Sequence, residues 1–277
     1  MNMSSFMKWQ RDRRRSNSFC EETFGEDFLQ DGKMMKILIT NDDGISSEVL
    51  LPLAKWAKRF GEVTVVVPKY EQSGKSHCAE FRNAFEVKQV PFDDPDIKAY
   101  TVDSFPADCV RFALACMQTS FDFVISGINR GLNMGVDILY SGTLGAIFEA
   151  ATHGLPAVAL SAKAKGLGEA LEALGEIKEF FDVHGLMKKN NLYNVNIPLH
   201  HKGIRITRMG ERYYADEFFP QGNDIYMPGY RDTWTEVTNI EYDVDAVFSG
   251  FISVTPMILE RTNLAVFDEL KALNDRL

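Results

Sequence analysis

Short apolar runs alternate with amphipathic segments from residue 35 onward. The runs are continuous rather than alternating, which is typical of strands buried on both faces of a parallel sheet. We predict such strands at residues 36–40, 63–67, 121–125, 156–160 and 192–197, with 84–90 and 98–102 as a hairpin or sheet edge. Apolar residues at helical spacing predict intervening helices at 46–60, 106–117, 144–153 and 167–184. This βαβ rhythm predicts an α/β fold with a doubly wound, mainly parallel sheet, in which 192–197 is the last strand.

The two ends of the chain depart from this rhythm. Residues 1–34 combine an arginine cluster with an acidic stretch and show no sustained hydrophobic period, so we expect a non-core extension before the domain at 35–277. Residues 203–257 contain short β-like runs rich in Tyr, Phe, Gly and Thr, which we expect to form an arm outside the sheet. An amphipathic helix is predicted at 263–276. The aromatic side chains of the arm are typical of a subunit interface, so we expect at least a homodimer.

Charge and cysteine content narrow the range of functions. The 277 residues carry a formal net charge of −9, which argues against non-specific binding to nucleic-acid polymers or anionic membranes. The four cysteines show no metal-ligand spacing and fit a reduced, cytoplasmic protein. A small anionic ligand remains compatible with the net charge, because a local metal ion or helix terminus can outweigh it.

The most informative segment is the polar turn after the first strand, where Asn41, Asp42, Asp43 and Gly44 follow residues 36–40. In open α/β sheets, ligands bind at the carboxyl ends of the strands. Two adjacent carboxylates there repel each other, and an oxygen-liganded divalent cation relieves that repulsion. Taken alone, the same residues also fit a turn that caps the next helix.

A second loop, Glu71-Gln72-Ser73-Gly74-Lys75-Ser76, follows the second strand and falls at the same edge of the sheet. Its Gly-Lys-Ser suggests a P-loop, but that motif requires glycine at position 69, which is Lys69. The P-loop reading is therefore rejected. A hydroxyl-rich glycine loop remains, and Ser73 can supply a ligand oxygen.

The third loop runs from Ser126 to Asp137 and is rich in Gly and Asn, with Asn129 and Asn133 among them. It leads through Tyr140 to Ser141-Gly142-Thr143 at the start of a helix. Backbone N–H groups, hydroxyls and the positive end of the helix dipole make such a start a good anion cradle. The glycines do not match the Gly-x-Gly-x-x-Gly fingerprint, so the loop does not indicate NAD.

These loops together fit metal-assisted phosphoryl transfer to water. Asp42 and Asp43, with Ser73 and Asn129, would hold one divalent metal ion through oxygen atoms. The helix start at Ser141, Gly142 and Thr143 would hold the phosphate. The metal would polarise a phosphate oxygen and lower the pKa of a bound water.

The chain from Met35 to the C-terminus resembles the SurE (stationary-phase survival protein) family of metal-dependent 5′-nucleotidases. The matching segments, in family order, are residues 39–45, 73–74, 106–110, 126–137, 140–146, 194–198 and 243–256. The segments 39–45 and 126–146 contribute most to this resemblance. The sequence departs from the family at Asp103-Ser104-Phe105, in the arm at 211–230, and in its extra leader.

The resemblance implies a Rossmann-like fold with a C-terminal arm that is exchanged between the subunits of a homodimer or homotetramer. It implies hydrolysis of nucleoside 5′-monophosphates, with 3′-monophosphates and short polyphosphate as further substrates. It also implies one Mg²⁺ or Mn²⁺ per subunit on Asp42, Asp43, Ser73 and Asn129. Of these, Asp42, Asp43 and Asn129 would be catalytic. The residues expected to bind substrate are Asn41, Asn133, Ser141, Gly142 and Thr143.

Two alternatives remain at this point. An aspartyl-phosphate phosphatase of the haloacid-dehalogenase type needs an Asp-x-Asp pair, whereas Asp42 and Asp43 are adjacent. A non-enzymatic nucleotide-binding regulator on the same fold would be expected to have lost a carboxylate or the asparagine, and none of the metal-ligand candidates is missing.

Overall fold

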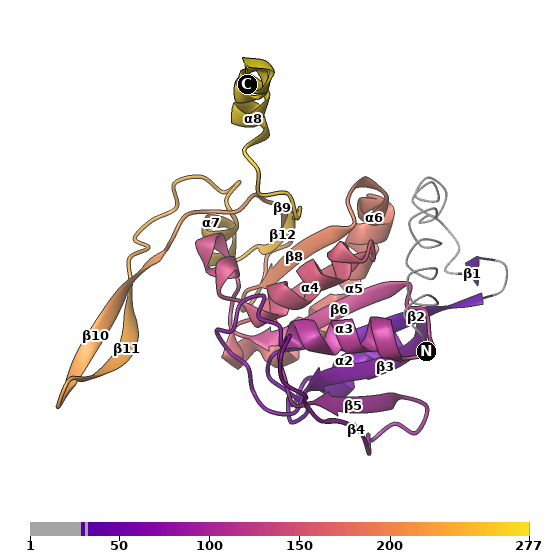
Figure 1. Ribbon diagram of the computed structural model, residues 1–277. Coiled ribbons are helices and arrows are strands. Elements are labelled where there is room, and N and C mark those ends of the chain that lie inside the picture. The colour runs from indigo at the N-terminus through magenta and orange to yellow at the C-terminus, as the bar shows by residue number, and fades with distance from the viewer. Residues whose placement is uncertain (1–28, 31–32, 277) are drawn as a thin grey trace.

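A computed structural model describes residues 29–30 and 33–276 (Figure 1). The prediction of a non-core extension lies largely outside the described residues. The described part of that segment is the short strand β1 (Leu29–Gln30), which pairs antiparallel with the start of β2 (Lys33–Thr40). The sheet therefore begins slightly before the predicted boundary at residue 35.

One sheet forms the centre of the molecule, with the strand order β4-β5-β3-β2-β6-β7-β8-β12-β9 and β1 added beside β2. Its further strands are β3 (Gly61–Pro68), β4 (Val87–Val90), β5 (Lys98–Val102), β6 (Phe123–Arg130), β7 (Ala157–Ala162), β8 (Leu192–Ile197), β9 (Ile204–Ile206) and β12 (Ile252–Pro256). The six strands β5, β3, β2, β6, β7 and β8 run parallel to one another, whereas β4 and β12 pair antiparallel with β5 and β8. The prediction of a mainly parallel sheet is confirmed.

The order of the strands places a crevice beside β2. From β2 the chain builds outward through β3 to β5, and it then returns through a helix to β6 on the other side of β2. In the register of this pair, Ile37 lies beside Phe123 and Thr40 beside Ser126. Such a reversal leaves a crevice at the carboxyl ends of the two strands, where open α/β sheets bind their ligands.

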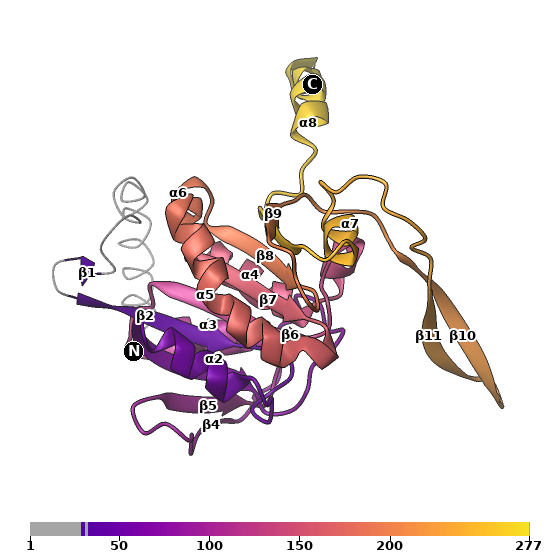
Figure 2. The same cartoon turned by 180° about the vertical axis from the view of Figure 1, so that it is seen from behind.

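Helices cover both faces of the sheet. The helices of the described residues are α2 (Leu50–Ala57), α3 (Pro106–Cys116), α4 (Gly142–Thr152), α5 (Leu167–Val183), α6 (Leu186–Lys189), α7 (Asp243–Phe248) and α8 (Leu264–Leu270), with 3₁₀ segments η2 (Gly135–Leu139), η3 (Ala164–Gly166) and η4 (Lys271–Arg276). Helices α3 and α4 lie on one face (Figure 1), and α2 and α5 lie on the other (Figure 2). Along β2, Ile37 and Ile39 pack toward the α2 and α5 face, whereas Leu38 packs toward α3 and α4. This two-sided burial explains the continuous apolar run.

The helix predicted at 46–60 is shorter than expected, because residues 44–49 form turns before α2 begins at Leu50. The strand predicted at 84–90 begins only at Val87. Both differences lie at the ends of elements, where the hydrophobic pattern does not fix the boundary.

The prediction that residues 203–257 lie outside the sheet is wrong for both ends of that segment. Strand β12 pairs antiparallel with β8, and β9 pairs parallel with β12, so β8 is not the last strand. The buried positions of β12 include Ser253 and Thr255, and the Thr255 hydroxyl bonds that of Thr207 at 2.7 Å. Because polar side chains occupy buried positions, the hydrophobic pattern did not reveal this strand.

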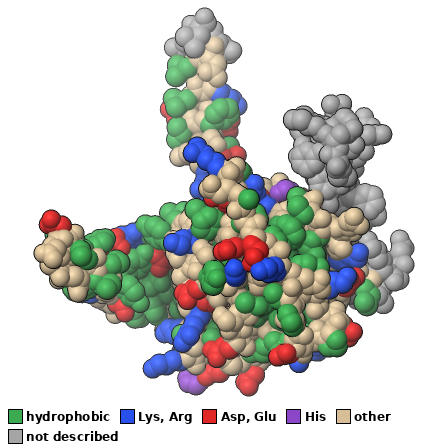
Figure 3. Space-filling model, turned by 60° about the horizontal axis from the view of Figure 1, so that its bottom comes forward, with side chains coloured by type: hydrophobic (Ala, Val, Ile, Leu, Met, Phe, Trp, Pro, Cys, Tyr) green, Lys and Arg blue, Asp and Glu red, His purple; other side chains and the backbone are tan. Residues whose placement is uncertain are grey.

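The remaining middle of that segment does extend away from the domain. Strands β10 (Tyr214–Gly222) and β11 (Ile225–Asp232) form an antiparallel hairpin that projects to one side, and α8 projects from the top (Figure 1). Hydrophobic side chains gather along both elements (Figure 3). The exposed ones include Phe218, Phe219, Tyr226 and Met227 on the hairpin and Leu264, Phe267, Leu270 and Leu273 in the C-terminal segment.

None of the helices in the described part of the chain combines the length and the apolar character needed to cross a membrane.

Candidate active site

The carboxyl end of β2 is a turn held by Asn41. Asn41 is fully buried, and its side chain bonds both backbone groups of Gly44, each at 3.0 Å. Gly44 has a φ of +81°, and a Cβ there would lie 3.1 Å from the carbonyl oxygen of Pro68. Only glycine meets both demands without strain. The turn therefore presents Asp42 and Asp43 at the edge of the sheet.

The two aspartates are held by different neighbours. Asp42 is 4% exposed, and its Oδ1 accepts a hydrogen bond from Thr143 Oγ1 at 2.7 Å. Asp43 is half-buried, and its Oδ2 accepts a hydrogen bond from the backbone N–H of Arg130, at the end of β6, at 3.2 Å. The pair therefore connects β2 with both α4 and β6.

Their surroundings disfavour the ionised form of both carboxyls. Burial raises the pKa of Asp42 to about 6; the charges of Asp43 and Glu71 add to this, while the hydrogen bond from Thr143 opposes it. Burial also raises the pKa of Asp43; Glu71 adds to this, and the Arg130 backbone opposes it. A bound cation would reverse this balance, because it favours the charged form of nearby carboxylates.

Ser73 approaches the aspartates from the loop between β3 and β4. Its hydroxyl donates to Glu71 Oε1 at 2.7 Å. The backbone N–H of Gln72 donates to the carbonyl of Asp42 at 2.7 Å, which ties the loop to the aspartate turn. The order of the chain predicted this convergence, since β2 and β3 are parallel neighbours.

The two asparagines of the third loop differ in what holds them. Asn129 Nδ2 donates to the carbonyl of Gly131 at 2.9 Å, so its Oδ1 is the side-chain atom left to act as a ligand. Asn133 Nδ2 donates to Ser161 Oγ at 2.9 Å, and its backbone N–H donates to Asn196 Oδ1 at 2.7 Å. Asn133 is thus anchored to β7 and β8 through buried polar groups.

Helix α4 begins against Asp42. Ser141 is its N-cap and accepts the backbone N–H of Leu144 on Oγ at 3.1 Å. The N–H groups of Gly142 and Thr143 precede the first intrahelical hydrogen bond and are therefore available to an anion. A Cβ at Gly142 would lie 3.1 Å from Asp42 Cβ, so glycine allows this close approach.

These loops enclose a cleft of about 410 Å³. It is lined by Asp42, Ser73, Gly74, Asn129, Arg130, Asn133, Asp137, Tyr140, Ser141, Tyr214 and Asp216. Of the predicted site residues, the cleft brings together Asp42, Ser73, Asn129, Asn133 and Ser141. Asp43 adjoins the cleft through Arg130. Asn41, Gly142 and Thr143 support the site from behind and do not line it.

The donor set fits a divalent cation. Asp42, Asp43, Ser73 and Asn129 offer only oxygen atoms, which suit Mg²⁺ and Mn²⁺. Among residues 33–276, no group of three or more His, Cys, Asp or Glu side chains is arranged to hold a metal ion. A metal at this edge would therefore depend on hydroxyl and amide oxygens in addition to two carboxylates.

Comparison with known proteins identifies the family. The profile of the family described as Survival protein SurE matches residues 37–216. This chain belongs to the SurE family. It is 36% identical to the 5′-nucleotidase SurE of Caldanaerobacter subterraneus subsp. tengcongensis over 248 residues, covering 85% of this chain and 96% of the relative. It is 31% identical to the 5′-nucleotidase SurE of Clostridium beijerinckii over 260 residues, covering 87% of this chain and 100% of the relative.

A solved structure supports the SurE fold. The crystal structure of SurE from Aquifex aeolicus matches with a TM-score of 0.71 at 32% identity, covering 87% of this chain and 100% of that chain. Family membership, together with the adjacent rather than alternate aspartates, leaves the haloacid-dehalogenase alternative without support.

Sequence reasoning missed several residues of the SurE cleft. Glu71 influences both aspartates, although it stands in a loop that was singled out only for Ser73. Asp137 lies within η2 and Tyr140 directly follows it, both inside segments in which other residues were predicted to form the site. Tyr214 and Asp216 are separated from every motif along the chain, and no sequence signal points to them.

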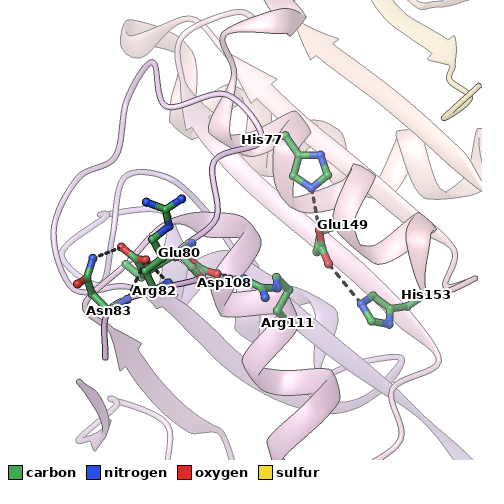
Figure 4. A network of polar contacts seen from close by, with 9 residues as sticks. His77, Glu80, Arg82, Asn83, Asp108, Arg111, Glu149 and His153 are labelled. Carbon is green, nitrogen blue, oxygen red and sulfur yellow. Dashed lines mark hydrogen bonds and ion pairs between the residues drawn. The ribbon is translucent and has the colours of Figure 1, made fainter. Parts of the chain in front are cut away.

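A cluster on α4 anchors the Ser73 loop (Figure 4). Glu149 contacts His77 Nε2 at 2.8 Å and His153 Nε2 at 3.3 Å. Burial raises the pKa of Glu149, but the hydrogen bonds with His153 and His77 outweigh it and lower the pKa to about 2. Because this value lies below the ordinary 4.5, the stabilisation is complete above pH 4.5 and is lost as the pH falls toward 2.

A second cluster holds the following part of the loop against α3 (Figure 4). Asp108 is 1% exposed and accepts the backbone N–H of Glu80 at 2.9 Å. It also pairs with Arg111 at 2.5 Å. The loop is thus fixed to both helices on this face.

We expect His77→Gln to weaken activation by the metal. The substitution loosens the loop that carries Ser73, so the Mg²⁺ concentration for half-maximal phosphate release should rise by about three- to tenfold. The matched control is His153→Gln, which alters the same carboxylate from outside the loop and should leave this concentration within about twofold. Equal shifts in the two variants, measured by metal titration at fixed substrate, would contradict the anchoring role.

Proposed function

We propose that this SurE chain hydrolyses nucleoside 5′-monophosphates to nucleoside and orthophosphate with the help of one divalent cation. The observation that carries the proposal is the hydrogen bond from Thr143 to Asp42. It joins the carboxylate pair to the anion-binding start of α4, so the two halves of a phosphate-hydrolysing site share one edge of the sheet. The 5′-nucleotidase names of the relatives support the same activity.

The metal ligands in this proposal are Asp42, Asp43, Ser73 and Asn129. A Mg²⁺ or Mn²⁺ ion bound there supplies a Lewis acid for a phosphate oxygen and lowers the pKa of a bound water. Thr143 and the Arg130 backbone orient the two carboxylates, and Gly131 orients the amide of Asn129.

The phosphate is held at the start of α4. Gly142 and Thr143 do not line the cleft themselves, but their N–H groups precede the first intrahelical hydrogen bond, and the positive end of the helix dipole adds to the attraction of an anion at this end of α4. Ser141 lines the cleft beside them. Water adds to the phosphorus, the P–O5′ bond breaks, and the nucleoside leaves with a proton on its 5′-oxygen.

Phosphate release from a substrate panel tests the substrate range. The metal-loaded protein is given nucleoside 5′-monophosphates, nucleoside 3′-monophosphates and inorganic tripolyphosphate. We expect the 5′-monophosphates to have the highest kcat/KM, with slower turnover of the other two. Binding of nucleotide without phosphate release would favour the regulator alternative instead.

The second part of the proposal concerns assembly. The hairpin β10–β11 and the helix α8 expose apolar side chains that a second subunit would cover, as expected for an exchanged arm in a homodimer or homotetramer. We expect a mass in solution, from light scattering at micromolar concentration, of at least twice the 31.3 kDa chain. A monomeric mass would contradict this part and leave the activity untouched.

A further inference from the structure

Part of the cleft wall comes from outside the metal and phosphate residues. Asp137 and Tyr140 come from η2 and the residue after it, and Tyr214 and Asp216 come from the base of the hairpin strand β10. We call these four residues the hairpin wall. Tyr140 is 50% exposed, so its ring is open to a ligand.

Contacts between the two elements fix the hairpin wall. The Tyr214 hydroxyl donates to Asp137. Arg212 donates to Asp216 at 2.8 Å and to the Tyr140 hydroxyl at 3.2 Å, with its guanidinium 5.1 Å from the centroid of the Tyr214 ring. One arginine therefore sets the positions of a carboxylate and two aromatic rings. A preorganised wall of this kind costs little ordering when a ligand binds.

The chemistry of the hairpin wall suits an uncharged, hydrogen-bonding group. Aromatic rings offer a stacking surface, and the carboxylates of Asp137 and Asp216 accept hydrogen bonds from hydroxyl or amino groups. The same carboxylates repel an anion. The positive charge of Arg212, beside the wall, is already paired with Asp216. Arg130, the basic residue among those that line the cleft, interacts with Asp43.

We propose that the hairpin wall is the leaving-group subsite, which binds the uncharged nucleoside and disfavours a polyanionic leaving group. This inference rests on the proposed function. It assigns substrate selection to Asp216 and Tyr214, which lie at the C-terminal end of the segment that matches the family.

The test compares three substrates that share the reacting phosphate and differ in the leaving group: adenosine 5′-monophosphate, phenyl phosphate and inorganic tripolyphosphate. For Asp216→Asn, we expect the kcat/KM ratio of the nucleotide to phenyl phosphate to fall by about fivefold. We expect the ratio of tripolyphosphate to phenyl phosphate to rise by about three- to tenfold, since a repelling charge is removed and Arg212 is released.

The matched control is Glu217→Gln. Glu217 is the next residue of β10, it pairs with Arg231 at 3.0 Å, and it does not line the cleft. Both ratios should stay within about twofold of the wild type. Asp137→Asn, on the other wall element, gives an independent variant that should move the ratios in the same direction as Asp216→Asn.

Unchanged kcat/KM ratios in both Asp216→Asn and Asp137→Asn would overturn the assignment. Changes in Glu217→Gln as large as those in the two cleft variants would also overturn it. That failure is distinct from failure of the proposed function, in which the metal-loaded wild type would release phosphate from none of the three substrates.

Discussion

Replacing Asp42 by asparagine should abolish metal-dependent phosphate release and at the same time stabilise the metal-free protein above pH 6. The first effect, at least about 10³-fold in kcat/KM, follows from loss of a charged metal ligand. The second follows from burial, which raises the pKa of Asp42 from the ordinary 3.8 to about 6. The folded protein therefore resists ionisation of this carboxyl.

The pH dependence fixes the sign of the stability change. Because the folded pKa lies above the unfolded one, ionisation destabilises the fold progressively from about pH 4 to pH 6, and the full penalty remains above that. Asparagine avoids the penalty and can still accept the hydrogen bond from Thr143. The expected gain in unfolding free energy of the metal-free protein is about 1–3 kcal/mol at pH 7.5 and vanishes near pH 4.

Thermal unfolding of both proteins at pH 4, 6 and 7.5, with and without Mn²⁺, measures this. Mn²⁺ should raise the Tm of the wild type at pH 7.5 and leave Asp42→Asn nearly unchanged, because only the wild type binds it tightly. If Asp42→Asn is less stable than the metal-free wild type at pH 7.5, burial does not destabilise the charged form of Asp42 as described.

Replacing Asp243 by alanine should destabilise the protein by about 3–5 kcal/mol. Asp243 is fully buried, and its oxygens accept the backbone N–H groups of Gly135 at 2.9 Å and of Gly210 and Val244 at 2.8 Å. Alanine leaves these three donors buried without an acceptor. Gly135 has no room to shift, since a Cβ there would already lie 2.4 Å from the Glu211 carbonyl oxygen.

Urea denaturation measures this loss, with Asp232→Ala as the control at an exposed position of the hairpin. The control should change the unfolding free energy by less than about 0.5 kcal/mol. Since Gly135 lies in the loop that carries Asn133 and Asp137, kcat/KM should also fall in Asp243→Ala. A loss below about 1 kcal/mol would show that α7 does not hold the cleft loop as described.

The sequence was sufficient to predict the parts of the fold that depend on continuous burial. The runs at β2, β3, β6 and β7 consist mostly of consecutive apolar residues, which is typical of strands buried on both faces. It was insufficient for β12, because Ser253 and Thr255 are polar residues at buried positions, and the hydrogen-bond partner of Thr255 is Thr207, 48 positions away along the chain. The same limit applies to Asp243, a charged residue that is fully buried because its carboxylate accepts three backbone N–H groups from distant or adjacent residues.

The candidate site shows a similar division. Asp42 and Thr143 were each singled out, but for separate roles, because their contact spans 101 positions of the chain. Thr143 was predicted to hold phosphate together with Ser141 and Gly142, and in the structure its hydroxyl donates to Asp42. Tyr214 and Asp216 enter the cleft only through the geometry of the hairpin, which local spacing does not encode.

Phosphate release from a nucleoside 5′-monophosphate tests the central claim most directly. It is measured for metal-stripped protein, for protein reloaded with Mg²⁺ or Mn²⁺, and for Asp43→Asn. The matched control is Asp122→Asn, at the opposite end of the sheet, where a side-chain oxygen can still accept the Lys36 N–H. We predict turnover that appears only with metal, is lost in Asp43→Asn and is retained in Asp122→Asn. Equal turnover in stripped and reloaded protein, or full activity of Asp43→Asn, would contradict a metal-dependent nucleotidase built on this carboxylate pair.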